Sequence, residues 1–430
     1  MRRLATLLAA ALAAALLTAP ASAAPRVLSS TPAADAAPLT LSAGASCEYP
    51  ADPYQGRPWF LQRVQLDQLW AQSKGEGVRV AVIDTGVDAD HPQLADAVDV
   101  GSGADLIPKD KRREREPTGP TADLVGHGTK VAGIIAARPA DNTGFVGIAP
   151  EATIIPIRQN NDQGAGDTTT LAQAIRHAID EGADVINISQ DTTQPLAADH
   201  PLKAAIDQAL AQEIVVVASA GNDGADGKVK NTYPASFPGV LAVAASDRNN
   251  ERALFSQRGE FVGIAAPGVD LVSTVPGGGH CADNGTSFAA PFVAGVAALL
   301  RAEHPEWKQH QIVAQIQQTA ERAISGRDRH VGWGVVDPVR ALTQDDRPID
   351  EPVAREGVEQ APVPEPAPLQ LGESYAERNE RLGTYVFLTG AVLVTSVAGT
   401  TVVLRDRRRR TAAVASPDRE HPAPTSPYSP

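Results

Sequence analysis

The chain of 430 residues is 43% hydrophobic and 21% charged, a composition typical of a folded protein rather than a disordered one. Its formal net charge of −13 argues against a nucleic-acid partner, because phosphate binding requires a basic surface. The length allows more than one domain, so the organisation of the protein has to be sought in the order of its segments.

The first segment has the features of a secretory signal peptide. Residues 1–24 start with Arg2 and Arg3, continue with the apolar stretch LATLLAAALAAALL and end close to the small residues Ala-Ser-Ala. This order of basic, apolar and small residues predicts export and cleavage near residue 24. The alternative is a buried helix.

Residues 25–57 are rich in Ala, Pro and Ser and show no clear periodicity, so they read as an N-terminal extension. The segment is short for a self-standing domain, which rarely falls below about 40 residues without a disulfide or a metal. We therefore expect the extension to drape over the domain that follows it, rather than to act as a removable folding chaperone.

Residues 58–343 alternate between strand-like and helix-like segments. Short runs of β-branched and apolar residues predict parallel strands buried on both faces, at 78–85, 152–158, 183–189 and 214–220. Helical patterns lie between them, among them 168–182 and 201–213. The alternation predicts one α/β domain, with a mostly parallel central sheet between two layers of helices. Charged residues dominate the segment 109–116, which predicts a solvated loop or, alternatively, a mobile loop near a cleft.

The C-terminal part has the features of a membrane anchor. Residues 344–381 are acidic and proline-rich, which is typical of an extended spacer. The next segment, 382–404, has 23 residues without a charge, enough at about 1.5 Å per residue to cross a hydrocarbon core of about 30 Å. Residues 405–430 begin with RDRRRR, and basic residues stay on the cytoplasmic side. The order predicts a single-pass type I membrane protein with its folded domain outside the cytoplasm; a soluble core helix is the alternative for 382–404.

Three polar side chains lie at the ends of predicted buried elements. Asp84 follows a strand, His127 lies between two glycines at the start of a helical run, and Ser287 heads a long apolar helix with Pro291 in its first turn. Singly, each has a common structural explanation, as a turn residue, a structural histidine or a helix cap. Together they suit amide hydrolysis, which needs a serine activated by a base that a carboxylate orients. At a helix start, backbone N–H groups and the helix dipole could also stabilise an oxyanion.

Residues 78–302 resemble a subtilisin-type serine protease. The motifs VAVIDTGVDADHPQL, GHGTKVAGIIAA, VVVASAGNDG and NGTSFAAPFVAGVAALL occur in the order of that family, and Asp, His, Ser is the order of its triad. The resemblance implies that Asp84 orients His127, that His127 is the general base and then the general acid, and that Ser287 is the nucleophile. It also implies that Asn222 and the backbone N–H of Ser287 donate hydrogen bonds to the oxyanion.

The resemblance further implies that the substrate groove is lined by Ser189, Gln190, Asp191, Ala220 and Gly221. Many subtilisins have Ser-Leu-Gly-Gly after the matching strand, where the backbone pairs with the substrate and the glycines line the specificity pocket. This chain has Ser-Gln-Asp-Thr at the same place. The bulkier side chains predict a narrowed or polar pocket and a restricted range of substrates, unless they point to solvent.

The chain has two cysteines, Cys47 in the N-terminal extension and Cys281 six residues before Ser287. A compartment outside the cytoplasm permits disulfides, and two cysteines allow one intramolecular pairing. We therefore predict a Cys47–Cys281 disulfide that fastens the extension beside the segment carrying the serine.

The whole architecture resembles the mycosins, membrane-anchored subtilisin-like proteases of type VII secretion. The shared features are a signal peptide, a short extension with a cysteine, a proline-rich spacer, one membrane helix and a basic tail. The resemblance implies protein or peptide substrates and a place in a type VII secretion membrane complex; the alternative is a structural subunit whose protease activity is secondary. No cofactor is expected, since the sequence has no zinc-type spacing and no calcium-loop pattern, although subtilisins often bind calcium through scattered oxygens.

Overall fold

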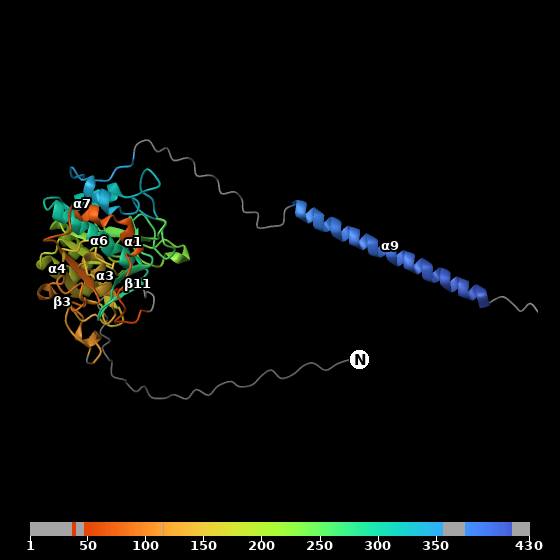
Figure 1. The fold of residues 1–430 in the computed structure, drawn as a ribbon, viewed down its shortest axis with the longest axis horizontal. Coiled ribbons are helices and arrows are strands. Elements are labelled where there is room, and N and C mark those ends of the chain that lie inside the picture. Colours follow the sequence, from red (N-terminus) through yellow and green to blue (C-terminus); the bar gives the residue numbers. More distant parts are fainter. Residues whose placement is uncertain (1–36, 40–46, 115, 356–374, 415–430) are drawn as a thin grey trace, which may run out of the picture. The chain divides into compact units, whose positions relative to one another are not determined.

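The structure is a computed structural model that describes residues 37–39, 47–114, 116–355 and 375–414. The described residues fall into two units, divided between Glu359 and Gln360 (Figure 1). The first unit is an α/β body and the second is a long helix. The predicted signal peptide lies outside the described residues.

The centre of the body is a parallel sheet. Within the described residues, seven strands form it in the order β3-β4-β2-β6-β7-β8-β9, and every pairing is parallel. The strands are β2 (Arg79–Asp84), β3 (Ala104–Asp105), β4 (Thr153–Arg158), β6 (Val185–Ile188), β7 (Val215–Ser219), β8 (Leu241–Ser246) and β9 (Val262–Pro267). Nearly all side chains of β2, β4, β6 and β7 are buried, as expected of strands covered on both faces. All four predicted strands are confirmed.

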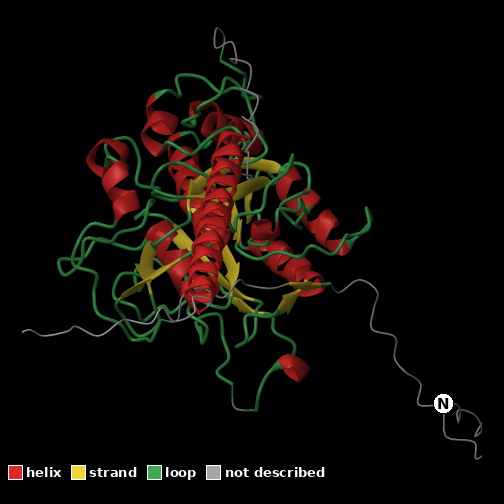
Figure 2. Cartoon of the chain, turned by 90° about the vertical axis from the view of Figure 1, so that its right-hand side faces the viewer, coloured by secondary structure: helices red, strands yellow, loops and turns green. Residues whose placement is uncertain are grey.

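Helices cover both faces of this sheet, and Figure 2 shows strands with helices on either side. The side chains of β2 alternate between the two layers: Val80 and Val82 pack in the core with α3 and α6, whereas Ala81 and Ile83 pack in the core with α4 and α5. The four helices are α3 (His127–Ala136), α4 (Thr168–Asp180), α5 (Pro201–Ala211) and α6 (Thr286–Glu303). The predicted three-layer α/β/α fold is confirmed.

Shorter elements complete the body. They are the helices α1 (Trp59–Arg63), α2 (Leu66–Trp70), α7 (Gln309–Thr319) and α8 (Pro338–Thr343), and the 3-10 turns η1 (Val100–Ser102), η2 (Lys109–Lys111) and η3 (Gly224–Asp226). Two antiparallel pairs flank the sheet: β1 (Pro38–Leu39) with β5 (Gly166–Asp167), and β10 (Leu271–Thr274) with β11 (His280–Asp283). Since β1 belongs to the predicted extension, part of the extension pairs with the body.

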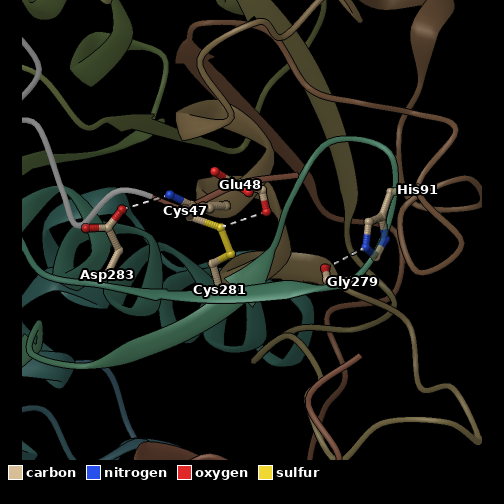
Figure 3. Close-up of a disulfide and its surroundings, with 7 residues drawn as sticks. Cys47, Glu48, His91, Gly279, Cys281 and Asp283 are labelled. Atoms are coloured by element: carbon tan, nitrogen blue, oxygen red, sulfur yellow. Dashed lines mark hydrogen bonds and ion pairs between the residues drawn. A yellow bond between two sulfur atoms is a disulfide. The ribbon is translucent and has the colours of Figure 1, made fainter. Parts of the chain in front are cut away.

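The N-terminal extension lies on the body wherever it is described. Cys47 and Cys281 form the predicted disulfide, with Cα atoms 6.3 Å apart and a sequence separation of 234 (Figure 3). Shortly after the disulfide, the Ala51 N–H donates to the Gly278 carbonyl at 3.0 Å. The disulfide therefore fastens the extension to β11, next to the start of α6.

The chain also stays on the body past the predicted end of the domain. Asp345 Oδ2 lies 2.6 Å from His304 Nε2, and the Arg355 N–H donates to the Ser325 carbonyl at 2.8 Å. The first part of the proline-rich spacer, up to residue 355, therefore packs against the domain.

The charged segment 109–116 is not solvated along its whole length. At the end of β4, Arg158 pairs with Glu116 and donates to the Pro117 carbonyl at 2.7 Å. The side chains of Arg158 and Glu116 are each 1% exposed. Buried charges need partners, so this ion pair holds the end of the segment against the sheet.

The second unit is α9 (Tyr375–Val414). Its portion Tyr375–Arg410, of 36 residues, is long and apolar enough to cross a membrane. The uncharged stretch 382–404 lies within it.

Candidate active site

Asp84 and His127 meet at the carboxyl edge of the sheet. Asp84 ends β2 and His127 begins α3, and both side chains are buried. His127 Nδ1 lies 2.8 and 2.9 Å from the two carboxylate oxygens of Asp84. The Nδ1–H therefore donates to Asp84, which fixes the tautomer of the imidazole and leaves Nε2 as the nitrogen that can accept a proton.

The other ring nitrogen, His127 Nε2, is buried and has no hydrogen-bond partner among the described residues. Burial alone would lower the pKa of His127, but the charge of Asp84 and its hydrogen bond outweigh this effect and hold the pKa above the ordinary 6.5. Such a nitrogen suits a general base, because it can take a proton from a neighbouring hydroxyl and Asp84 stabilises the imidazolium that results.

Asp123 holds the start of α3. The residue before the helix is Gly126, which makes no side-chain cap hydrogen bond. In its place the Asp123 carboxylate accepts from the N–H groups of Gly126 and Thr129, at 2.7 and 2.9 Å, and from the Thr85 hydroxyl at 2.7 Å. Asp123 was missed in the sequence; an acidic residue shortly before a glycine-started helix was the available signal.

Ser287 is the second residue of α6 and not its cap. The cap position is taken by Gly285, which makes no side-chain cap hydrogen bond. The side chain of Ser287 is nearly buried, at 4% exposure. Its backbone N–H belongs to the first turn, where N–H groups lack helical partners and the dipole is positive. The alternative of a serine cap is therefore wrong.

Pro291 lies in the second turn of α6, so its predicted place in the first turn is wrong. Without an N–H, Pro291 cannot donate to the carbonyl of Ser287, four residues earlier. Ser189 takes this role: its hydroxyl donates to the Ser287 carbonyl at 2.8 Å and accepts from the Asn187 side chain at 2.8 Å. The end of β6 thus supports the backbone of Ser287.

Asn222 follows β7 and faces the start of α6. Its Oδ1 accepts from the N–H of Thr286 at 2.9 Å and from the Thr286 hydroxyl at 3.1 Å. The Asn222 Nδ2 and the Ser287 backbone N each lie 3.6 Å from the point that a Cβ on Gly285 would occupy. Two N–H donors therefore flank one small space beside Ser287, an arrangement suited to an oxyanion.

The helices of His127 and Ser287 touch through an aromatic side chain. The ring of His127 packs on that of Phe288, the residue after Ser287, with centroids 5.1 Å apart. The structure thus brings the predicted Asp84, His127, Asn222 and Ser287 to one edge of the sheet.

The segment after β7 is also held beside α6. The Gly221 N–H donates to the Thr286 hydroxyl at 3.2 Å, and the Ala220 carbonyl accepts from the Thr232 hydroxyl at 2.8 Å. Ala220 and Gly221 therefore lie next to the serine-bearing turn.

Gln190 and Asp191 take different positions. Gln190 is buried, pairs with the Gln159 amide and donates to the Ile83 carbonyl at 3.4 Å, so it faces the interior rather than a groove or solvent. Asp191 reaches toward the segment of Gly221: its Oδ2 lies 3.1 Å from the point that a Cβ on Gly221 would occupy. Its carboxylate thus fills space between the segment that follows β6 and the segment that follows β7.

The surroundings of Asp191 disfavour its charge. Burial and, second, the charge of Asp223 raise the pKa of Asp191 to about 7. A carboxyl group that is partly protonated at neutral pH can donate as well as accept a hydrogen bond.

A buried histidine next to Cys281, His280, connects the extension to the body. The Tyr54 N–H donates to His280 Nδ1 at 3.1 Å, and His280 Nε2 lies 2.7 Å from Gln93 Oε1. Burial and the charge of His91 lower the pKa of His280 to about 4. The neutral ring therefore joins the extension to β11. Within the described part of the chain, no group of three or more His, Cys, Asp or Glu side chains is placed to hold a metal.

Comparisons with known proteins show what the α/β body is similar to. Residues 75–334 match the family model described as the subtilase family. The chain is 37% identical to subtilisin E of Bacillus subtilis (strain 168) over 292 residues, which is 67% of this chain and 72% of subtilisin E. The structure of the MycP3 protease from the type VII (ESX-3) secretion system matches with a TM-score of 0.61 and 33% identity, over 72% of this chain and 94% of that one. The structure of MycP1 from Mycobacterium smegmatis matches with a TM-score of 0.62 and 30% identity, over 76% of this chain and 95% of that one.

Proposed function

The chain belongs to the subtilase family of serine endopeptidases, and from this premise we propose that Asp84, His127 and Ser287 are its catalytic triad. The observation that carries the proposal is the state of His127. Its Nδ1 lies 2.8 Å from the Asp84 carboxylate, while its buried Nε2 has no partner among the described residues. This is the arrangement that a general base needs before a substrate arrives.

In the first half of the reaction, Ser287 Oγ attacks the carbonyl carbon of the scissile peptide bond. Its proton passes to His127 Nε2, and the carbonyl oxygen becomes an oxyanion that accepts from Asn222 Nδ2 and the Ser287 N–H. The C–N bond then breaks, and His127 gives its proton to the leaving amine. The product is an acyl ester on Ser287.

In the second half, a water molecule attacks the ester carbon and gives a proton to His127. The same two N–H donors hold the second oxyanion. When the ester bond breaks, His127 returns the proton to Ser287 Oγ and the carboxylic acid product leaves. Throughout, Asp84 keeps its charge and stabilises the imidazolium by its hydrogen bond.

We propose that Asp191 restricts the substrates of this site. Its carboxylate occupies space against Gly221 that a glycine would leave open, so large apolar side chains should be disfavoured. Cleavage of a random peptide library by the full chain and by Asp191→Gly tests this idea. The variant should accept a wider range of residues before the scissile bond, and an unchanged range would refute it.

We also propose that the protein is a single-pass type I membrane protein with residues 58–343 outside the cytoplasm. The supporting observations are the uncharged stretch 382–404 in α9, the basic residues after it and the Cys47–Cys281 disulfide, which requires an oxidising compartment. The similarity to MycP1 and MycP3 favours a place in a type VII secretion membrane complex, with secreted proteins as substrates.

The triad is tested on the purified full chain in detergent, by peptide hydrolysis and by labelling with a fluorophosphonate probe. Ser287→Ala should lose both, because it removes the hydroxyl that attacks the peptide bond and the probe. The control is Ser325→Ala, which removes a hydroxyl in the loop after α7 and keeps the backbone contact to Arg355. Labelling that persists in Ser287→Ala would exclude Ser287 as the nucleophile.

The main alternative is a structural subunit of the secretion complex with secondary protease activity. Proteomics of the cell envelope and the medium separates the two roles, in cells with the wild type, with Ser287→Ala and with the gene deleted. A processing role predicts uncleaved substrates in the Ser287→Ala cells. Secretion that survives Ser287→Ala but not deletion would assign the main role to the scaffold.

A further inference from the structure

A buried ion pair lies one turn away from His127. The Lys130 ammonium donates to Asp283 Oδ2 at 2.8 Å, and the two side chains are 8% and 4% exposed. Such a pair adds little net stability, because the cost of removing two charges from water offsets their attraction. Its presence beside the site therefore calls for a role other than stabilising the fold.

The ion pair reaches His127 through Phe288. Lys130 Nζ lies 6.0 Å from the centroid of the Phe288 ring, and the same ring packs on His127 at 5.1 Å. A cation near an aromatic face is attracted to it, most strongly away from water. Lys130 and His127 therefore contact the same side chain, which comes from the serine-bearing helix.

The backbone of Lys130 is fixed as well. The hydroxyls of Ser273 and Thr274 on β10 donate to the carbonyls of Lys130 and Thr129, at 2.6 and 2.8 Å. Gly133 permits this approach, since a Cβ there would lie 2.1 Å from the Thr274 hydroxyl oxygen. Lys130 is thus held at both ends, its backbone by β10 and its ammonium by Asp283.

The charged groups around His127 act in opposite directions. Asp84 on β2 and Asp123 before α3 favour the imidazolium, whereas Lys130 on α3 opposes it. Asp283 on β11 partly neutralises Lys130. Tyr49 of the extension also packs next to Gly126, but burial and the charge of Asp123 raise its pKa above 10.0, so it is uncharged near neutral pH.

We propose that Lys130, paired with Asp283, is a positioning residue of the site: through Phe288 it keeps the His127 ring in place, and its charge limits how tightly His127 holds a proton. The balance matters because His127 has to take a proton from Ser287 and then release it to the leaving amine. The inference rests on the proposed triad.

The test compares Lys130→Met with Asp283→Asn in the purified full chain. The measured quantity is the pH midpoint below which fluorophosphonate labelling of Ser287 slows. Lys130→Met removes the cation and should raise the midpoint; Asp283→Asn leaves the ammonium unpaired and should lower it. Each shift should be on the order of half to one pH unit for a charge at this range in a partly buried site.

The controls separate this role from a structural one. Lys130→Arg keeps the charge and should restore the wild-type midpoint. Lys203→Met removes a lysine from a more exposed pair with Asp207 on α5 and should leave the midpoint unchanged. A slower rate with an unmoved midpoint, or shifts of the two variants in the same direction, would overturn the proposal; thermal unfolding identifies variants that fail to fold.

A second readout does not depend on the chemistry. The imidazole nitrogens of the full chain carrying Ser287→Ala are followed by NMR with labelled histidine, and His127 is assigned by its loss in His127→Gln. The same opposite shifts of the His127 pKa are expected for Lys130→Met and Asp283→Asn. If the wild type is never labelled by the probe, the triad fails, while the NMR titration still decides the role of Lys130.

Discussion

The helices on the two faces of the sheet begin in different ways. On one face, α4 follows Asp167, whose carboxylate accepts from the second and third N–H of the helix at 3.0 and 2.8 Å, and α5 follows His200, whose ring accepts from a helix N–H at 3.1 Å. On the other face, α3 and α6 follow Gly126 and Gly285, which make no side-chain cap hydrogen bond. In the first pair the residue directly before the helix is the cap, whereas in the second pair that residue is a glycine.

The difference matters most at α6, where the first turn carries Ser287 and has no local cap. A local cap occupies the first N–H groups, so an anion cannot reach them. At α3 the support comes from Asp123, three residues before Gly126, whereas at α6 it comes from the distant Ser189 and Asn222. This arrangement keeps His127 and the N–H of Ser287 at the carboxyl edge of the sheet.

The largest effect is expected from Asn222→Ala, on the uncapped face. Loss of one oxyanion donor should lower the turnover number about 100- to 1,000-fold, since the donor acts mainly in the transition state. The same substitution should lower the free energy of unfolding by less than it raises the activation free energy of the reaction. Peptide hydrolysis and thermal unfolding of the same sample measure the two quantities; a large loss of stability with normal turnover would show that Asn222 is only a structural support for Thr286.

A smaller effect is expected from Asp167→Ala, on the capped face. Removing the cap of α4 should lower the free energy of unfolding by about 1 kcal/mol and leave the rate of fluorophosphonate labelling unchanged. The matched control is Asp167→Asn, which keeps a capping acceptor and loses the ion pair with Lys111. Denaturant unfolding measures the difference. A loss of labelling in Asp167→Ala would show that the two faces are not independent.

The smallest expected effect is on the pH dependence of fluorophosphonate labelling. Because Asp84 holds the pKa of His127 above 6.5 and only the neutral ring accepts the Ser287 proton, labelling should slow as the pH falls through a midpoint above 6.5. Asp84→Asn should move the midpoint down as well as slow the reaction. A pH series of labelling rates measures it, and an unmoved midpoint would assign the titration to a group other than His127.

The parts of the protein that local sequence determines were predictable. Buried β-branched runs located four strands of the sheet, and Asp84 follows directly from the first of them. The disulfide followed from the count, since Cys47 has no other partner than Cys281. In each case the evidence lies within a few neighbouring residues or in the number of cysteines.

The parts that depend on distant pairs were not predictable. The partner of Arg158 is Glu116, 42 residues away, and the partner of Lys130 is Asp283, 153 residues away. A single sequence shows these residues only as charges, which usually lie on the surface. The position of Pro291 was missed for a related reason: α6 begins at Thr286, whose N–H donates to Asn222, 64 residues earlier in the chain.

The disulfide can form only after most of the chain has been synthesised. Cys281 leaves the ribosome 234 residues after Cys47, when the strands of the central sheet have already been made and the helix of Ser287 has not. Until then Cys47 is a free thiol, and no cross-link joins the extension to the body. Closure of the bridge thus cannot precede the synthesis of the seven strands of the described sheet.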